Sequence, residues 1–273
     1  MIDSITQMPA IGAKKPAAYQ PSRVEATYSP AGKAMAQAAK DFFDKGGMSW
    51  ETARTSLRDS FTQIQENPQA TAAEKALAKM GIAAGEETMP NKDSARMRAA
   101  IMNTIAAAAP GPIGAVLSQT GLNVYELTGI KWSSIRVGLR AGLETIRQTP
   151  QTAGSEKTLA LLGVNFGAHK MPDSDAARVR AEVLKIISEP EEQTSSQAVI
   201  KAGLNAYRLG GIQWSSARAI LRDGFEAILE SPEASETQKQ LATAGIKAGS
   251  PKMDNQDAAK ARYEIMKQLQ NLK

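Results

Sequence analysis

The sequence contains no cysteine and a single histidine, His169, among its 273 residues. Without cysteine the chain forms no disulfide, no thiolate nucleophile and no cysteine-ligated zinc or iron–sulfur site. One histidine also excludes two-histidine metal motifs. A phosphate-binding Gly-x-x-x-x-Gly-Lys motif and a Gly-x-Ser-x-Gly nucleophile elbow are both missing. These absences remove familiar signatures of catalysis, and we expect neither a metal nor a cofactor.

Long apolar runs are missing as well. No stretch approaches 18 uninterrupted apolar residues, so we expect no membrane-spanning helix. The first 20 residues do not combine a basic lead with an apolar core, as a cleavable Sec-type signal peptide does. We therefore expect a cytoplasmic protein, or one secreted without such a signal. At 42% hydrophobic residues, the chain is too apolar to be wholly disordered.

Excess charge of one sign is small. The net charge of +5 comes from 33 basic and 28 acidic residues. Divided along the chain, residues 1–32 and 33–114 each carry a surplus of +1, residues 115–196 carry none, and residues 197–273 carry +3. No domain-sized basic surface is implied, which argues against nucleic acid as the partner.

An internal repeat is the strongest feature that is present. Tryptophans, prolines and glycines recur at a spacing of 82 residues without gaps: Trp50, Trp132 and Trp214; Pro68, Pro150 and Pro232; Gly81, Gly163 and Gly245. The second and third copies are identical at roughly 30 of 77 aligned positions. Residues 82 apart are called equivalent below. We expect three tandem helical repeats of about 82 residues, because a repeat of this kind determines the fold.

The first half of each copy predicts two helices. The first covers about residues 33–45, and Gly47 closes it. The second runs from about Trp50 to Glu66, where apolar residues recur at spacings of three and four and form one buried stripe. Pro68 ends this helix, because the residue before a proline is pushed out of helical geometry.

The second half of each copy predicts two more helices. Thr71 and Glu74 match a reciprocal capping box at the start of the third helix. We expect Gly81, followed by an apolar residue, to close that helix in a left-handed Schellman ending. The fourth helix is expected to begin at Asn91 as its N-cap, with Asp93 opposing the helix dipole in the first turn.

These patterns predict an all-α chain of four segments. Residues 1–30 are rich in proline and poor in large apolar groups, and we expect them to be disordered, with a possible role as an export signal. Three repeats of about four helices each should then occupy residues 31–110, 111–192 and 193–273. Residues 109–112 and 189–196 are the expected linkers between them.

Tryptophan and glycine are interpreted as structural anchors of this fold. The tryptophans should be core residues at a helix start, and the glycines should end helices. The anchors predicted in this way are Trp50, Trp132, Trp214, Gly81, Gly163 and Gly245.

Three arginines recur in every copy and are the candidate partner-binding residues. They are Arg54, Arg58 and Arg98 in the first copy, Arg136, Arg140 and Arg180 in the second, and Arg218, Arg222 and Arg262 in the third. Internal roles compete with this interpretation. The stem of Arg54 could pack on Trp50, one turn earlier, or its guanidinium could pair with Asp93. Arginines without an internal partner would instead bind an anion or an acidic partner.

A triplicated unit favours binding over catalysis. A catalytic site needs one asymmetric set of convergent polar groups, whereas three copies supply three similar surfaces. Linked weak contacts gain from their effective concentration. We therefore expect a non-enzymatic module that binds another protein of unknown identity through three similar faces, and the oligomeric state stays open. An alternative is binding of an anionic phospholipid or nucleic acid through the arginines, which predicts strong salt dependence.

The composition of residues 1–30 suggests a second alternative. This polar segment, which carries proline, serine and threonine and lacks a cleavable signal, resembles the N-terminus of a bacterial type III secreted effector. The resemblance implies a virulence protein that acts on host proteins by binding. Some such effectors carry a Trp-x-x-x-Glu motif that regulates GTPases. Here Arg54, Arg136 and Arg218 occupy the glutamate position, so that activity is not implied.

Overall fold

The computed structural model describes residues 23–85, 88–166, 171–189, 194–249 and 252–272. Within these residues the chain is all-helical, with twelve α-helices and no strand. The expected all-α class is therefore confirmed. The helices are α1 (Pro30–Asp44), α2 (Trp50–Glu66), α3 (Ala72–Ala83), α4 (Asn91–Ala106), α5 (Ile113–Tyr125), α6 (Trp132–Gln148), α7 (Gly154–Phe166), α8 (Asp173–Ser188), α9 (Ser195–Arg208), α10 (Trp214–Glu230), α11 (Glu236–Lys247) and α12 (Asn255–Gln270).

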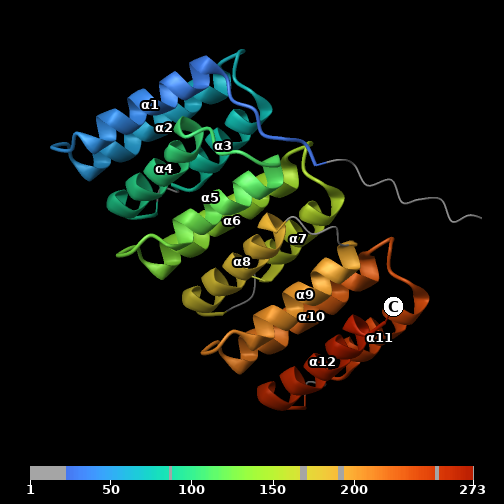
Figure 1. Ribbon diagram of the computed structural model, residues 1–273. Helices are drawn as coiled ribbons and strands as arrows, with labels where there is room; N and C mark the ends of the chain where they lie inside the picture. Colours follow the sequence, from blue (N-terminus) through green and yellow to red (C-terminus); the bar gives the residue numbers. More distant parts are fainter. Residues whose placement is uncertain (1–22, 86–87, 167–170, 190–193, 250–251, 273) are drawn as a thin grey trace, which may run out of the picture.

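The helices form two layers (Figure 1). In one layer α1, α4, α5, α8, α9 and α12 pack in that order, and in the other α2, α3, α6, α7, α10 and α11 do so. One continuous hydrophobic core lies between the layers and extends from Ala36 to Leu269. Because buried side chains connect the helices throughout, neighbouring segments of the chain share a single core.

The helix that begins at Trp50 shows the predicted pattern. It ends at Glu66, and Ala53, Leu57, Phe61 and Ile64 form its buried side. The extended backbone of Asn67, with ψ of 120°, ends it one residue before the proline, as the restriction on pre-proline residues predicts. The helices at the two equivalent positions, α6 and α10, also hold 17 residues each.

The predicted helix-closing role is correct for one set of glycines and wrong for another. Gly47, Gly129 and Gly211 follow α1, α5 and α9 with φ of 76°, 67° and 74°, in the left-handed region that favours glycine. Gly81, in contrast, lies inside α3, and Gly163 and Gly245 lie inside α7 and α11.

The recurrence of this second set of glycines reflects close packing between helices. A Cβ atom on Gly81 would come within 2.3 Å of the Phe61 ring, and one on Gly245 within 2.3 Å of the Phe225 ring. On Gly163 the nearest atom would be a methyl carbon of Leu143, at 2.8 Å. Glycine thus lets an aromatic or aliphatic side chain of α2, α6 or α10 lie against the backbone of the following helix.

The predicted N-caps of α4 and α8 are also wrong. Pro90 and Pro172 occupy the N-cap positions, so Asn91 is the first residue of α4 rather than its cap. The aspartates of the first turn face a different helix from the one they belong to. Asp93 Oδ2 accepts a hydrogen bond from the backbone N–H of Lys131, at 3.1 Å, just before α6. Asp175 accepts one from Gln213, at 2.9 Å, just before α10.

The described residues before α1 are tied to the fold, which differs from the expectation that the whole of 1–30 is disordered. Ala26 donates a backbone hydrogen bond to Gly111 O at 2.8 Å, and Ile113 donates one to Val24 O at 2.9 Å. The same two bonds fix the expected linker at 109–112. Residues 1–22, and residues 190–193 of the other expected linker, lie outside the described residues.

Candidate binding surface

Three of the nine predicted arginines lie in the interior. Arg98, Arg180 and Arg262 are 2%, 2% and 4% exposed. Arg98 donates to Gly81 O at 3.1 Å from Nε and to Arg54 O at 3.0 Å from Nη1, so one guanidinium joins the end of α3 to the middle of α2. Arg180 and Arg262 make the equivalent bonds.

These arginines bind the carbonyl groups at the ends of α3, α7 and α11, where a helix-ending glycine was expected. The last carbonyl groups of a helix have no partner within it. Arg98 also donates to the carbonyls of Ile82 and Gly85, at 3.2 and 3.1 Å. Burial, and then the charges of Arg54 and Arg58, lower the pKa of Arg98 to about 10, so the group stays charged at neutral pH. Arg98, Arg180 and Arg262 are thus at most 4% exposed, and a partner could reach little of their side chains.

A second set of arginines joins the start of the fourth helix in each copy to the second helix. Arg54 donates to Asn91 Oδ1 at 2.8 Å, and Arg136 pairs with Asp173 at the same distance. Arg218 donates to Asn255 Oδ1 at 3.0 Å. The predicted pair between Arg54 and Asp93 is therefore wrong, because the partner lies two residues earlier in α4.

The third set reaches the surface. The side chain of Arg58 is 55% exposed and lies 3.6 Å from Asp59. Arg140 is exposed on α6. Arg222 lies 3.4 Å from Glu226 and 3.5 Å from Asp223. In the first copy Arg54, Arg58 and Arg98 do come together around a cleft of about 220 Å³ that Glu51 also lines.

The tryptophans are not core residues, contrary to the prediction. Trp50, Trp132 and Trp214 are 45%, 47% and 43% exposed. Each is the first residue of its helix, and the side chain of a helix's first residue points back beyond the helix start. Along α2, burial begins only at Ala53, one turn later.

The three helices that begin with a tryptophan start on one edge of the molecule (Figure 1). The connections α1–α2, α5–α6 and α9–α10 all end on the same side, at the left in Figure 1, and each leads directly into a tryptophan. We call Trp50, Trp132 and Trp214 the tryptophan edge. Three half-exposed indoles at equivalent positions form a repeated surface feature, and aromatic side chains are enriched at protein interfaces.

An aromatic or cationic side chain lies beside each indole. The Tyr125 ring lies 6.2 Å from Trp132. The ammonium of Lys92 lies 5.9 Å from the Trp50 ring centroid, within cation–π range. Sequence reasoning missed these neighbours, although an aromatic residue precedes every tryptophan by seven positions: Phe43, Tyr125 and Tyr207.

The third indole belongs to a larger cluster. Tyr207 lies 6.1 Å from Trp214 and stacks on Tyr263 at 4.1 Å, and Lys260 lies 6.0 Å from the indole. Arg208 donates to the Tyr263 hydroxyl at 3.2 Å. Burial, and then Tyr263, raise the pKa of Tyr207. The residues equivalent to Tyr263 are alanines, so the stacked pair extends this site alone.

Comparisons of the chain with known proteins found no match. No protein-family model matches the chain, and no curated protein or solved structure does so. Within the described part of the chain, no three acidic or histidine side chains are grouped to hold a metal ion. None of the described helices is both long and apolar enough to cross a membrane. A function must therefore be argued from the surface itself.

Proposed function

We propose that the chain is a tandem array of three copies of one four-helix unit. Support comes from features that recur at the 82-residue spacing. The helices α2, α6 and α10 have equal lengths, and Arg98, Arg180 and Arg262 make the same buried bonds. A shared core joins neighbouring units, as stacked repeats do when each buries a face of the next.

The array binds another protein, without catalysis, through the tryptophan edge. The observation that carries this proposal is the exposure of nearly half of each indole at three equivalent helix starts. Tryptophan is among the residues that supply most binding energy at protein interfaces. Three such contacts on one rigid body would act together, because the first contact raises the effective concentration for the others.

The charges beside the edge favour an acidic partner segment. Lys92 and Lys260 lie against the indoles of Trp50 and Trp214, and Arg208 lies against Tyr263. A partner that placed apolar groups on the indoles would bring its flanking side chains next to these cations. Complementary charge there raises the association rate and selects among partners.

The test is capture of partners by the whole chain. The full protein serves as bait in a lysate of the source organism, beside a variant with Trp50→Ala, Trp132→Ala and Trp214→Ala combined. We expect proteins enriched by the native chain to be lost from the triple variant, and each single exchange to weaken binding of a purified partner about tenfold, the effect of roughly 1.4 kcal/mol.

Val24→Ala is the control. Val24 is 44% exposed and lies before the start of α1, whereas the tryptophan edge lies where α1 ends, so this variant tests the loss of an exposed apolar group away from the tryptophan edge. It should leave capture unchanged. A triple variant that enriches the same proteins as the native chain contradicts the proposal.

A further inference from the structure

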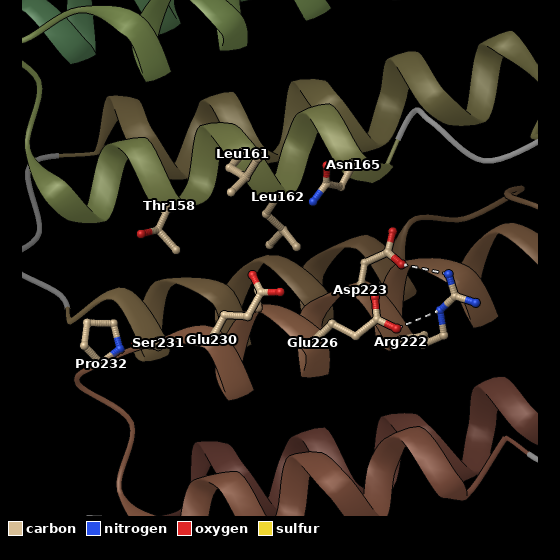
Figure 2. A pocket seen from close by; sticks show the side chains of 11 residues that line it. Thr158, Leu161, Leu162, Asn165, Arg222, Asp223, Glu226, Glu230, Ser231 and Pro232 are labelled. Atoms are coloured by element: carbon tan, nitrogen blue, oxygen red, sulfur yellow. Dashed lines mark hydrogen bonds and ion pairs between the residues drawn. The ribbon is translucent and has the colours of Figure 1, made fainter.

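A groove of about 400 Å³ lies between α7 and α10, and its lining on α10 begins at Arg222, eight residues after Trp214 (Figure 2). Thr158, Leu161, Leu162 and Asn165 form its α7 side, and residues 222–232 form the other. Figure 2 shows the side chains of the two helices facing one another across this space. The volume lies in the range of sites that bind small ligands or a few side chains of a peptide.

The α7 side of the groove is apolar. Leu161 is 39% exposed and is one of only a few large hydrophobic side chains that the described residues leave in solvent. Leu162 lies beneath it and is buried. Ala227 continues the apolar lining on α10. An apolar group seated there would remove the Leu161 side chain from water.

The α10 side of the groove is acidic. Asp223, Glu226 and Glu230 line it, and Arg222 is the one cation among the described residues of the lining. Arg222 already lies within 3.5 Å of both Asp223 and Glu226, and Glu230 is exposed. The lining therefore carries a surplus of negative charge beside an apolar strip.

The equivalent helices α3 and α6 lack this combination. Lys79, Ala141 and Gln148 stand where the groove has Leu161, Asp223 and Glu230. These helices also pack together. The packing of two neighbouring helices at this joint therefore does not require an exposed leucine or two extra carboxylates.

We propose that this groove binds a partner segment in which a branched aliphatic residue is followed by lysine or arginine. The aliphatic group covers Leu161, and the cation lies beside the exposed carboxylates of Glu226 and Glu230. Charge complementarity selects this occupant, since an acidic segment would meet these carboxylates. The groove is a second binding site, separate from the tryptophan edge.

The test uses the full chain and a fluorescein-labelled peptide, Gly-Leu-Lys-Arg-Leu-Gly, followed by fluorescence anisotropy. A peptide with two glutamates in place of lysine and arginine is the charge control. The variant Leu161→Lys with Glu230→Gln places the residues of the α3–α6 joint at two of the three differing positions. It should therefore fold, which circular dichroism checks. We expect the basic peptide to bind the native chain and about tenfold more weakly to this variant.

Two variants locate the binding. Lys79→Ala with Gln148→Ala, the matched exchange at α3 and α6, should leave the affinity unchanged. The triple tryptophan variant should also bind normally. Loss of peptide binding in the tryptophan variant, or equal binding of both peptides, overturns the groove proposal. Neither result bears on the tryptophan edge, which partner capture tests separately.

A second copy of this chain is the competing occupant. Sedimentation of the native protein and of the groove variant distinguishes it. Self-association that disappears in the variant overturns the peptide proposal, and so does the absence of any peptide binding up to about 1 mM. Monomers in both cases, together with groove-dependent peptide binding, support it.

Discussion

Asp93 Oδ2 on α4 accepts a hydrogen bond from Ser134 Oγ on α6, at 2.7 Å and across 41 residues of sequence. Asp175 and Ser216 repeat the contact at 2.8 Å. Both aspartates are buried and also accept the backbone N–H that precedes the next helix. Each carboxylate therefore caps a helix that follows its own, and so ties successive helix groups together.

Replacement of this carboxylate should weaken the fold at one joint. Asp93→Ala leaves the Lys131 N–H and the Ser134 hydroxyl without their acceptor, and we expect a loss of about 2–3 kcal/mol in the free energy of unfolding. Urea denaturation measures it. Asp257 is equivalent but exposed at the last helix, so Asp257→Ala should cost less than about 0.5 kcal/mol. Equal losses in the two variants would show that Asp93 does not join the helices energetically.

Loss of a buried arginine should be more severe. Arg98→Met keeps an apolar stem but removes the donors to four carbonyl groups on α2, α3 and the turn after α3. We expect a cost of about 3 kcal/mol, because buried acceptors then lack partners. Arg98→Lys should not restore stability, since an ammonium cannot reproduce the planar fork.

The exposed Arg58 supplies the control for that experiment. Arg58→Ala removes an arginine from the same copy but from the surface, where ion pairs contribute little. In guanidinium denaturation, the free energy of unfolding of Arg58→Ala should lie close to that of the native chain, and that of Arg98→Met should be much lower. If Arg98→Lys proves as stable as the native protein, the geometric argument is wrong.

Local sequence patterns predicted what depends on one helix alone. The apolar spacing of Leu57, Phe61 and Ile64 identified α2 and its buried side. The capping box of Thr71 and Glu74 placed the start of α3, and both of its hydrogen bonds are present. These features need only the periodicity of a helix and the unpaired N–H groups at its start.

Other features depend on how separate helices meet, and the sequence could not predict them. Gly81 has the same neighbours in sequence as a helix-ending glycine, but the Phe61 ring and the Arg98 guanidinium give it another role. Trp50 continues the direction of the apolar stripe, but at the start of α2 its side chain stays 45% exposed. A recurring residue indicates a recurring environment without telling whether that environment is core or surface.

Glu156 should make stability depend on pH. It is buried on α7, accepts the Ala153 N–H at 2.8 Å and lies 3.3 Å from Arg23 Nε. Burial raises its pKa, and the Ala153 and Arg23 contacts offset this only in part. The folded state therefore binds the proton more tightly than the unfolded state. The free energy of unfolding falls as the pH rises from the ordinary glutamate pKa through the raised one.

Glu156→Gln removes this penalty. Gln238, the equivalent residue, accepts the Ser235 N–H through its amide oxygen at 2.9 Å, so the cap survives the exchange. We expect Glu156→Gln to be more stable than the native chain at pH 7 and equally stable at a pH low enough to protonate the carboxyl in both states. Urea titrations from pH 3 to pH 7 measure the difference. If the native chain instead gains free energy of unfolding relative to Glu156→Gln as the pH rises from 3 to 7, the prediction that Glu156 destabilises the fold at neutral pH is wrong.

If the tryptophan edge serves binding, exchange of a tryptophan should weaken partner capture but lower the free energy of unfolding only slightly. Because nearly half of each indole stays in water, Trp50→Ala, Trp132→Ala and Trp214→Ala should each lower the free energy of unfolding by about 1 kcal/mol or less. Leu57→Ala, within the core of the same helix as Trp50, should cost about 2–5 kcal/mol. Thermal unfolding of these variants makes the comparison. A tryptophan exchange as costly as Leu57→Ala would assign the indole to the fold. If the tryptophan variants lose little free energy of unfolding but no longer capture partners, the half-exposed indole of each copy serves binding rather than folding.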